Sequence, residues 1–240
     1  MVSVKHSSKG KMNKALRLLY ALFLTCLLRL LELYLRTKIV RVRNLVLYMY
    51  PKVFPPIKNI STELLLKILD SYLEQGIEMC DMGTGSGVLA IYAAKKGAKV
   101  IAVDISDESL RAASINAKLN NVQLRIVKSD LFKNLAGKKF DLIVFNPPYF
   151  PFNMKDALGI AMCSGKKYST IIRFISQLPK HLKKDGKALI TLSTLLDIDY
   201  ILSVARRIGL RVEEVAKAPG SPGEEIIAYA LYCPSHLKSS

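Results

Sequence analysis

The chain has few of the residues from which metal sites and proton relays are built. Its 240 residues include three histidines and four cysteines. The cysteines, at positions 26, 80, 163 and 233, lack the close spacing of zinc ligands. The sequence therefore predicts a reducing compartment and no metal site. It predicts no chemistry for Cys80, because a cysteine inside an apolar strand is usually a small hydrophobic residue.

Acidic residues are also scarce. There are 36 Lys or Arg against 19 Asp or Glu, which gives a net charge of +17. Residues 1–43 hold ten of the basic residues and one acid, Glu32, so this segment carries +9 and the rest of the chain +8. A basic surface suits a ribosome-associated or nucleic-acid substrate, but a solvated lysine-rich face has the same composition. Charge alone leaves the substrate class open.

The N-terminal apolar run is shorter than a membrane span. Leu18–Leu28 is an uncharged run of 11 residues, and reaching the length of a span would require the helix to continue through Arg29 and Glu32 to Leu35. At the helical period, the charged residues between positions 14 and 36 fall largely on one face. We expect residues 1–45 to form a basic, hydrophobic helical extension that lies on a membrane, on a partner or on the catalytic domain. No cleavable signal peptide is expected, so the predicted location is cytoplasmic, with membrane association left open.

A glycine loop comes directly after the first strand expected in the body of the chain. Ile77–Asp81 has the pattern of a strand, Gly83, Gly85 and Gly87 that of a tight turn, and Ser86–Lys96 that of a helix. This order opens a nucleotide-binding crossover. Taken alone, such a loop is also an ordinary strand-to-helix turn, so its meaning depends on the residues that the later strands contribute.

Two further expected strands lead into acids. Lys99–Asp104 places Asp104 roughly 20 residues beyond the first glycine, where a ribose-binding acid falls. Val122–Val127 is followed by Asp130, which the topology brings to the same sheet edge, on the adenine side. Either acid alone is as well explained as a solvated strand end or a helix cap. Their order along the chain favours a nucleoside site.

The most informative stretch is Asn146-Pro147-Pro148-Tyr149, directly after the apolar strand Phe140–Phe145. The Asn146 side-chain carbonyl and a backbone carbonyl fixed by proline are two acceptors that can grip a planar NH2 group and aim its nitrogen. Together with the glycine loop, this grip indicates methyl transfer from S-adenosylmethionine, whose sulfonium is already activated, so that the enzyme mainly aligns the reactants.

Hydride transfer by a nicotinamide enzyme would use a similar opening to the sheet. That chemistry usually needs a proton donor in the crevice, and none of His6, His181 and His236 stands at an expected strand end. Methyl transfer needs no such donor, so the sequence favours it.

The later strands complete an α/β fold. Lys187–Leu192, Leu210–Val215 and Glu225–Tyr232 have strand patterns, and Pro219–Gly223 is expected to be the turn between the last two. We therefore expect a doubly wound, mostly parallel seven-stranded Rossmann-like sheet in a catalytic domain over residues 46–240.

From about Tyr50 to Tyr232 the chain resembles class I S-adenosylmethionine-dependent methyltransferases. Within that class it resembles the HemK-type protein-glutamine methyltransferases, which modify the Gly-Gly-Gln loop of translation release factors. Pro151 and the lead-in over residues 50–66 are similar to the short archaeal and eukaryotic branch. The chain departs from that branch at Ile57–Ile60, which lacks an acid, and at Cys163–Tyr168, which lacks a glycine-rich turn.

The resemblance implies site residues and partners. We expect the cofactor to contact Asp81, Gly83, Thr84, Gly85, Gly87, Asp104, Ile105, Asp130, Leu131 and Asn146, and the acceptor group to lie against Asn146, Pro147, Pro148 and Tyr149. The implied substrate is a glutamine side-chain amide in a release factor. A small zinc-binding activator subunit is expected to pair near the edge strand Val122–Val127.

Two other functions stay open on the sequence. The same tetrapeptide resembles those of RNA and DNA methyltransferases that act on an exocyclic base amine, where Tyr149 would stack on the base. A membrane-tethered binding protein that has kept the fold without turnover is the noncatalytic alternative. The complete set of motifs speaks against it.

Overall fold

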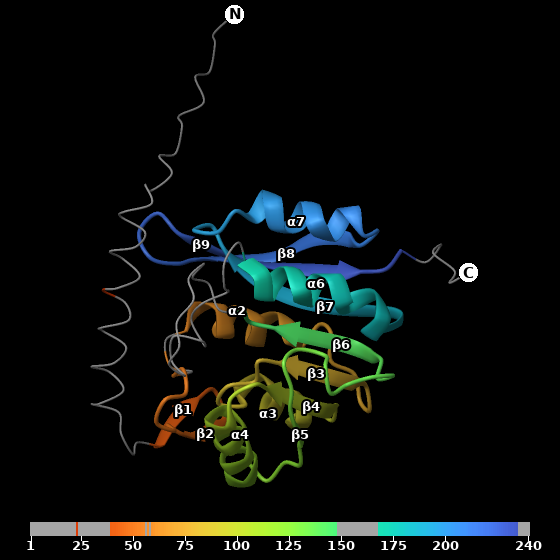
Figure 1. Cartoon of the computed structure of the whole chain (residues 1–240). Helices are drawn as coiled ribbons and strands as arrows, with labels where there is room; N and C mark the ends of the chain where they lie inside the picture. Colours follow the sequence, from red (N-terminus) through yellow and green to blue (C-terminus); the bar gives the residue numbers. More distant parts are fainter. Residues whose placement is uncertain (1–22, 24–38, 56, 58, 148–167, 235–240) are drawn as a thin grey trace, which may run out of the picture. The chain divides into compact units, whose positions relative to one another are not determined.

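The computed structural model describes residues 23, 39–55, 57, 59–147 and 168–234. The chain divides into two compact units, Met1–Leu35 and Arg36–Ser240. The α/β fold belongs to the second unit (Figure 1).

The second unit is built on a seven-stranded sheet. Its strands in chain order are β3 (Glu78–Met82), β4 (Lys99–Asp104), β5 (Arg125–Lys128), β6 (Phe140–Phe145), β7 (Leu182–Ser193), β8 (Arg211–Pro219) and β9 (Glu225–Tyr232). In space they adopt the order β5-β4-β3-β6-β7-β9-β8. The pairs from β5 to β7 are parallel, and β9 runs antiparallel to both of its neighbours. This confirms the mostly parallel, doubly wound fold, with the strand order reversing between β3 and β6.

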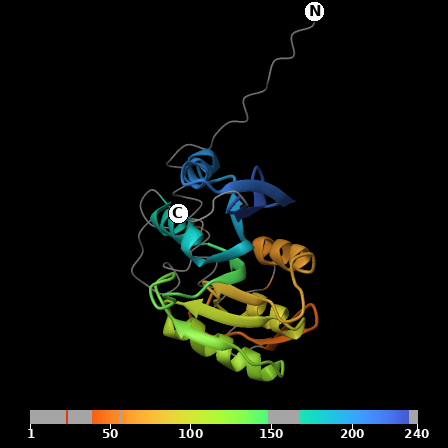
Figure 2. The ribbon, with the colours of Figure 1, turned by 90° about the vertical axis from the view of Figure 1, so that its right-hand side faces the viewer.

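Helices cover both faces of the sheet (Figure 2). They are α2 (Ile60–Leu69), α3 (Val88–Lys95), α4 (Asp107–Leu119), α6 (Ser169–His181) and α7 (Ile198–Arg207). Buried side chains of α2, α3 and α4 belong to one hydrophobic cluster, and those of α6 and α7 to another. The first three helices therefore pack on one face and the last two on the opposite face.

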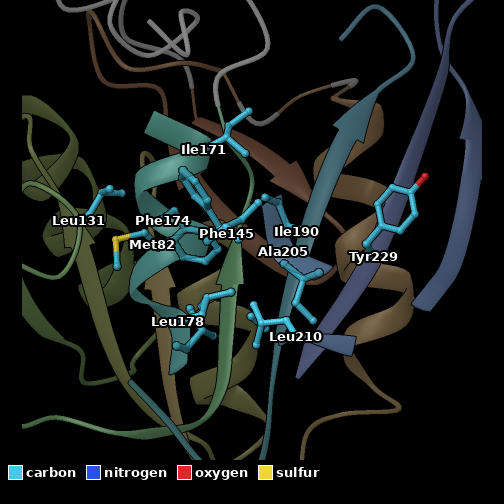
Figure 3. Packing of buried hydrophobic residues seen from close by; sticks show 14 of the residues in the cluster. Met82, Leu131, Phe145, Ile171, Phe174, Leu178, Ile190, Ala205, Leu210 and Tyr229 are labelled. Atoms are coloured by element: carbon cyan, nitrogen blue, oxygen red, sulfur yellow. The ribbon is translucent and has the colours of Figure 1, made fainter. Parts of the chain in front are cut away.

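Successive side chains along a strand point to opposite faces of the sheet, so each strand contributes to both hydrophobic clusters. On β6, Leu142 and Val144 face the α2–α4 side, and Ile143 and Phe145 face the α6–α7 side. Figure 3 shows Phe145 packed against Phe174 of α6, with their ring centroids 4.4 Å apart. Both faces of the strand are thus apolar, as expected for a parallel strand covered on both sides.

Three strands, β4, β6 and β9, have the predicted bounds. β3 is shifted by one residue from the prediction, β5 begins at Arg125 instead of Val122, and β7 extends from Leu182 to Ser193. β8 continues to Pro219 instead of ending at Val215. β5 is outermost, as predicted. Cys80 is fully buried on β3, and burial raises the pKa of its thiol well above the usual value, in keeping with a packing role.

A hairpin that the sequence pattern did not predict precedes the sheet. β1 (Ile39–Val42) and β2 (Leu45–Tyr48) pair antiparallel. β-branched residues at positions 39, 40, 42 and 46 favour strands here, so the segment expected to be helical up to residue 45 includes strand β1. The compact unit starts at Arg36, ahead of the predicted boundary at residue 46.

Asn116 of α4 and Asn120, which caps the end of α4, tie this hairpin to the domain. Asn116 Oδ1 accepts from the Tyr48 backbone N–H at 2.7 Å, and Asn120 Oδ1 accepts from that of Val46 at 3.0 Å. The Asn116 Nδ2 group also donates to the Ser86 carbonyl at 2.9 Å, within the glycine loop. The hairpin is therefore part of the framework that holds this loop.

The predicted apolar helix over residues 14–36 lies outside the described residues except for Phe23. Among the helices that the structure does describe, none is long and apolar enough to cross a bilayer.

Candidate active site

The candidate site lies at the carboxyl ends of β3, β4, β5, β6 and β7. Loops at this edge of a doubly wound sheet are where such folds bind ligands, next to the point at which the strand order reverses. The predicted residues at this edge are contributed by separate strand ends, which the parallel pairing brings together.

Asp81, near the end of β3, organises the glycine loop from inside. Its side chain is buried, and Oδ2 accepts from Thr84 Oγ1 at 2.6 Å and from the Ala90 backbone N–H at 3.2 Å. The second bond satisfies an amide in the first turn of α3, a helix whose N-cap, Gly87, has no side chain to do so. Asp81 and Thr84 therefore fix the path of the loop.

Burial controls the protonation of Asp81. Removal from water raises the pKa of its carboxyl to about 7, and the nearby carboxylate of Asp104 acts in the same direction. The hydrogen bonds from Thr84 and Ala90 oppose the shift but do not cancel it.

Two glycines of the loop are required for different reasons. Gly85 has φ +53°, and a Cβ placed there would meet only the Gly83 carbonyl oxygen, at 4.0 Å, so the loop backbone is open on that side. Gly87 has φ +83°, and a Cβ there would lie 3.0 Å from Ala113 Cα of α4. Gly85 thus leaves space for a ligand to approach the backbone, whereas Gly87 allows two helices to pack closely.

Asp104 ends β4 beside this opening. Its Oδ2 accepts from the Gly85 N–H at 3.0 Å and its Oδ1 from the Ser106 N–H at 2.9 Å. Burial raises the pKa of this carboxyl, against the effect of these bonds. Each carboxylate oxygen can accept further bonds, so a ribose diol can be held as well. The next side chain, Ile105, is half exposed, which offers an apolar surface beside the sugar position.

Asp130 and Leu131 come after β5 at the same edge. Asp130 Oδ2 accepts from Arg173 of α6 at 2.7 Å, in a pair that is open to solvent. Leu131 adopts φ +50°, which is uncommon for a residue with a side chain and marks a constrained turn. The structure thus places both predicted residues at the edge and adds Arg173, which was not predicted.

Asn146 lies at the end of β6 between α2 and β7. Its Oδ1 accepts from Thr191 Oγ1 of β7 at 2.7 Å, and its Nδ2 donates to Thr62 Oγ1 of α2 at 3.3 Å. Pro147 is buried next to it. The other two residues of the predicted grip, Pro148 and Tyr149, lie outside the described residues, as does Pro151.

Thr62 and Thr191 were not predicted from the sequence. A signal was present for Thr191: it aligns with Asn146 once β6 and β7 are taken as parallel neighbours, because Phe145 pairs with Ile190. For Thr62 no spacing rule gives a contact 84 residues away.

These residues fit a nucleoside cofactor that carries a sulfonium. Gly85 leaves the loop backbone open on one side, the Asp104 carboxylate has capacity to accept from hydroxyls, and Ile105 offers an apolar surface that suits a base.

Comparison with known proteins identifies the family. Residues 51–218, well over half of the chain, match the family model of the methyltransferase small domain. The chain belongs to this family. It is an S-adenosylmethionine-dependent methyltransferase of class I, as its motifs indicated.

Two curated relatives of the methyltransferase carry glutamine methylation in their names. One is named "Putative protein N5-glutamine methyltransferase", from Methanocaldococcus jannaschii, and is 36% identical over 195 residues, which are 79% of this chain and 96% of the relative. The other, a release factor glutamine methyltransferase from Streptococcus pneumoniae, is 41% identical over 100 residues, or 41% of this chain and 36% of the relative. Several other relatives are named ribosomal protein L11 methyltransferases, and the matches span less than half of their length.

Among solved structures, a chain of the Mtq2–Trm112 complex of E. cuniculi matches with a TM-score of 0.61. It is 18% identical, and the match covers 76% of this methyltransferase and 99% of that chain. At this identity the likeness shows a shared fold.

Proposed function

We propose that this methyltransferase transfers a methyl group from S-adenosylmethionine to the side-chain amide nitrogen of a glutamine in a translation release factor. The observation that carries the proposal is the Asn146 carboxamide, which is fixed at the carboxyl end of β6 by hydrogen bonds with two other elements. An amide oxygen in a fixed position can accept from an NH2 group and hold its nitrogen in line with a methyl donor.

The cofactor roles correspond to the geometry of the loop edge. Asp104 holds the ribose hydroxyls, and Ile105 packs on the adenine. Asp130 and the backbone of Leu131 bind the polar edge of the base. The main chain of Gly83, Gly85 and Gly87 borders the amino-acid part of the cofactor, while Asp81 and Thr84 hold the loop in shape.

The reaction itself makes modest demands on the protein. S-adenosylmethionine supplies an activated methyl group and leaves as S-adenosylhomocysteine when the glutamine nitrogen bonds to the methyl carbon and then loses a proton to water. Asn146 Oδ1 and the backbone carbonyl that the prolines fix accept the two amide hydrogens. This orients the nitrogen and stabilises the positive charge that develops on it. Alignment of this kind supplies about 7–11 kcal/mol in well-oriented reactions.

The substrate and partner assignments are supported by the relatives. The M. jannaschii relative covers most of this chain, and the S. pneumoniae relative is named for release factors. The E. cuniculi complex is described as responsible for methylation of the termination factor eRF1. We propose that β5, whose outer backbone edge has no neighbouring strand in the described sheet, pairs with a small activator protein.

The test is a competition between acceptor classes. The purified protein, with and without a candidate activator, is incubated with tritiated S-adenosylmethionine and either a release factor, the same factor with its loop glutamine replaced by alanine, or total RNA. We expect label on the intact factor alone, removable by protease, with mass spectrometry placing one methyl group on the glutamine. Label that nuclease removes and protease does not would replace this proposal with methylation of a base amine.

A further inference from the structure

Asn146 belongs to a hydrogen-bonded series that runs through three elements. Thr62 is in the first turn of α2, Asn146 comes directly after β6, and Thr191 is near the end of β7. The two threonines are buried, with 4% and 0% of their surface exposed. Two buried hydroxyl groups on either side of one carboxamide hold it in place more tightly than packing alone, because a side chain that moved away from them would lose both bonds.

The two distances indicate which way the amide is turned. Thr191 Oγ1 lies 2.7 Å from its partner, the usual length of an O–H···O bond, and shorter than most N–H···O bonds. The 3.3 Å contact with Thr62 is long for an O–H···O bond and acceptable for an N–H donor. The arrangement therefore places the amide oxygen toward β7 and the amide nitrogen toward α2.

The placement of each threonine has its own structural cause. Phe145 pairs with Ile190 in the parallel register, so Asn146 and Thr191 are adjacent one position further on. On the other side, the α2 N-cap Asn59 accepts from the Thr62 backbone N–H at 3.1 Å and so fixes the turn that carries Thr62. The backbone of each threonine is therefore held independently of Asn146, by the β7 register for Thr191 and by the α2 N-cap for Thr62.

We infer that Thr62 and Thr191 are positioning residues for methyl transfer, which hold the Asn146 carboxamide with its oxygen presented to the acceptor nitrogen. The inference rests on the proposed function of Asn146 and extends it to the two residues that support its side chain. A carboxamide turned the other way would present its own NH2 to the substrate NH2, donor against donor. Since a carbonyl oxygen accepts two bonds, the bond from Thr191 is compatible with one from the substrate.

The experiment compares hydroxyl removal with hydroxyl retention at each position. Thr191→Val and Thr62→Val keep a branched side chain and lose the hydroxyl, whereas Thr191→Ser and Thr62→Ser keep it. We expect Thr191→Val to lower kcat roughly tenfold, the size expected for losing one buried hydrogen bond, and Thr62→Val to lower it about threefold because its bond is longer. The serine variants should restore most of the rate, and the dissociation constant of S-adenosylmethionine should stay unchanged in all four.

A matched control lies three residues beyond Thr191. Thr194 is exposed, and its hydroxyl oxygen accepts from the Glu225 backbone N–H. Thr194→Val removes a hydroxyl that serves the backbone of β9, so it should leave kcat at the parent value. If Thr191→Val keeps the parent kcat, or if serine fails to restore a lost rate, the threonines do not position Asn146.

A second measurement needs no substrate, so it separates this inference from the proposed function. The Asn146 side-chain NH2 signals are assigned in a 15N spectrum by their loss in Asn146→Ala. We expect slow hydrogen exchange of these signals in the parent and faster exchange in the two valine variants. If the parent methylates no glutamine yet shows this protection, the proposed substrate is wrong and the positioning inference stands. Equal exchange in parent and valine variants overturns the inference.

Discussion

Replacing Asp81 by asparagine should make the free energy of unfolding less dependent on pH between about pH 4 and pH 7, because the Asp81 carboxyl destabilises the folded protein as the pH rises through this range. The Asp81 carboxyl has a usual pKa of 3.8, and burial raises that pKa to about 7 in the folded state. Between these values the folded protein holds a proton that the unfolded chain has released. The free energy of unfolding therefore falls as the pH rises through this window, and the contribution of the protonated carboxyl is fully present only below the unfolded pKa.

The size of the effect can be worked out from the shift. One pKa unit corresponds to about 1.4 kcal/mol, so a shift of roughly three units corresponds to about 4 kcal/mol between pH 4 and pH 8. Because the Asp81 side chain is only 1% exposed, solvent screening does not reduce this figure much. Asparagine keeps a carbonyl oxygen that accepts from Thr84 or the Ala90 amide, and it carries no charge at any pH in this range.

The assay is urea unfolding of the parent and Asp81→Asn at a series of pH values without cofactor. Contributions from groups that do not interact with Asp81 cancel in the difference between the two proteins, and the coupling to Asp104 is a smaller cause of the shift than burial. We expect the variant to gain about 4 kcal/mol relative to the parent as the pH rises from 4 to 8. Parallel profiles would refute the reasoning, because they would mean that the buried carboxyl titrates as it does in the unfolded chain.

Asp141 provides a control of the opposite sign. Burial favours its neutral form, but hydrogen bonds from Lys183 and the Glu78 N–H more than offset burial and hold the pKa of Asp141 below its usual value. Its contribution to stability is therefore present above pH 3.8 and is lost only as the pH falls further. Asp141→Asn should leave the slope between pH 5 and pH 8 unchanged.

Three other outcomes are expected. Asp104→Ala and Gly85→Val should each weaken S-adenosylmethionine binding at least tenfold in calorimetry, a loss of about 1.4 kcal/mol or more, and parent-like affinity in folded variants would remove the proposed cofactor site. Asn146→Ala should lower kcat at least tenfold, about 1.4 kcal/mol of barrier, while the cofactor affinity stays within twofold; an unchanged kcat would exclude the grip on the acceptor. Deletion of residues 1–35 should keep the fold and methyl transfer but abolish flotation with anionic liposomes. Deletion of residues 1–45 should also lower the melting temperature, because it removes β1. A full-length protein that does not float excludes the membrane interpretation of residues 14–36.

The sequence predicted the elements that depend on local pattern. The bounds of β4 and β6 correspond to apolar runs that lead into the polar residues Asp104 and Asn146. The edge position of β5 was expected from the family resemblance. The elements that were missed depend on contacts distant in sequence. The β1–β2 hairpin is stabilised by Asn116 of α4 and by its C-cap Asn120, about 70 residues away.

The same distinction applies to the site. Asp104 and Asn146 could be predicted because each stands at the end of an apolar strand, where the topology alone brings it to the binding edge. Asp81 was predicted as a cofactor residue, and the structure shows that its carboxylate bonds inward to Thr84 and Ala90. No sequence pattern distinguishes a side chain that faces the cofactor from one that faces the inside of the loop, because the two cases differ in side-chain orientation and not in sequence position.

The arrangement of the site assigns binding and alignment to different parts of the sheet. The residues proposed to bind the donor end or follow β3, β4 and β5, and Asn146, proposed to grip the acceptor, follows β6 and bonds to α2 and β7. Asn146 lies at the point where the two halves meet, since β3 and β6 are adjacent and the strand order reverses between them. A change at Thr191 therefore acts on the acceptor half without touching the cofactor loop. The separation of kcat from cofactor affinity in the threonine variants thus tests whether the two halves of this fold function independently.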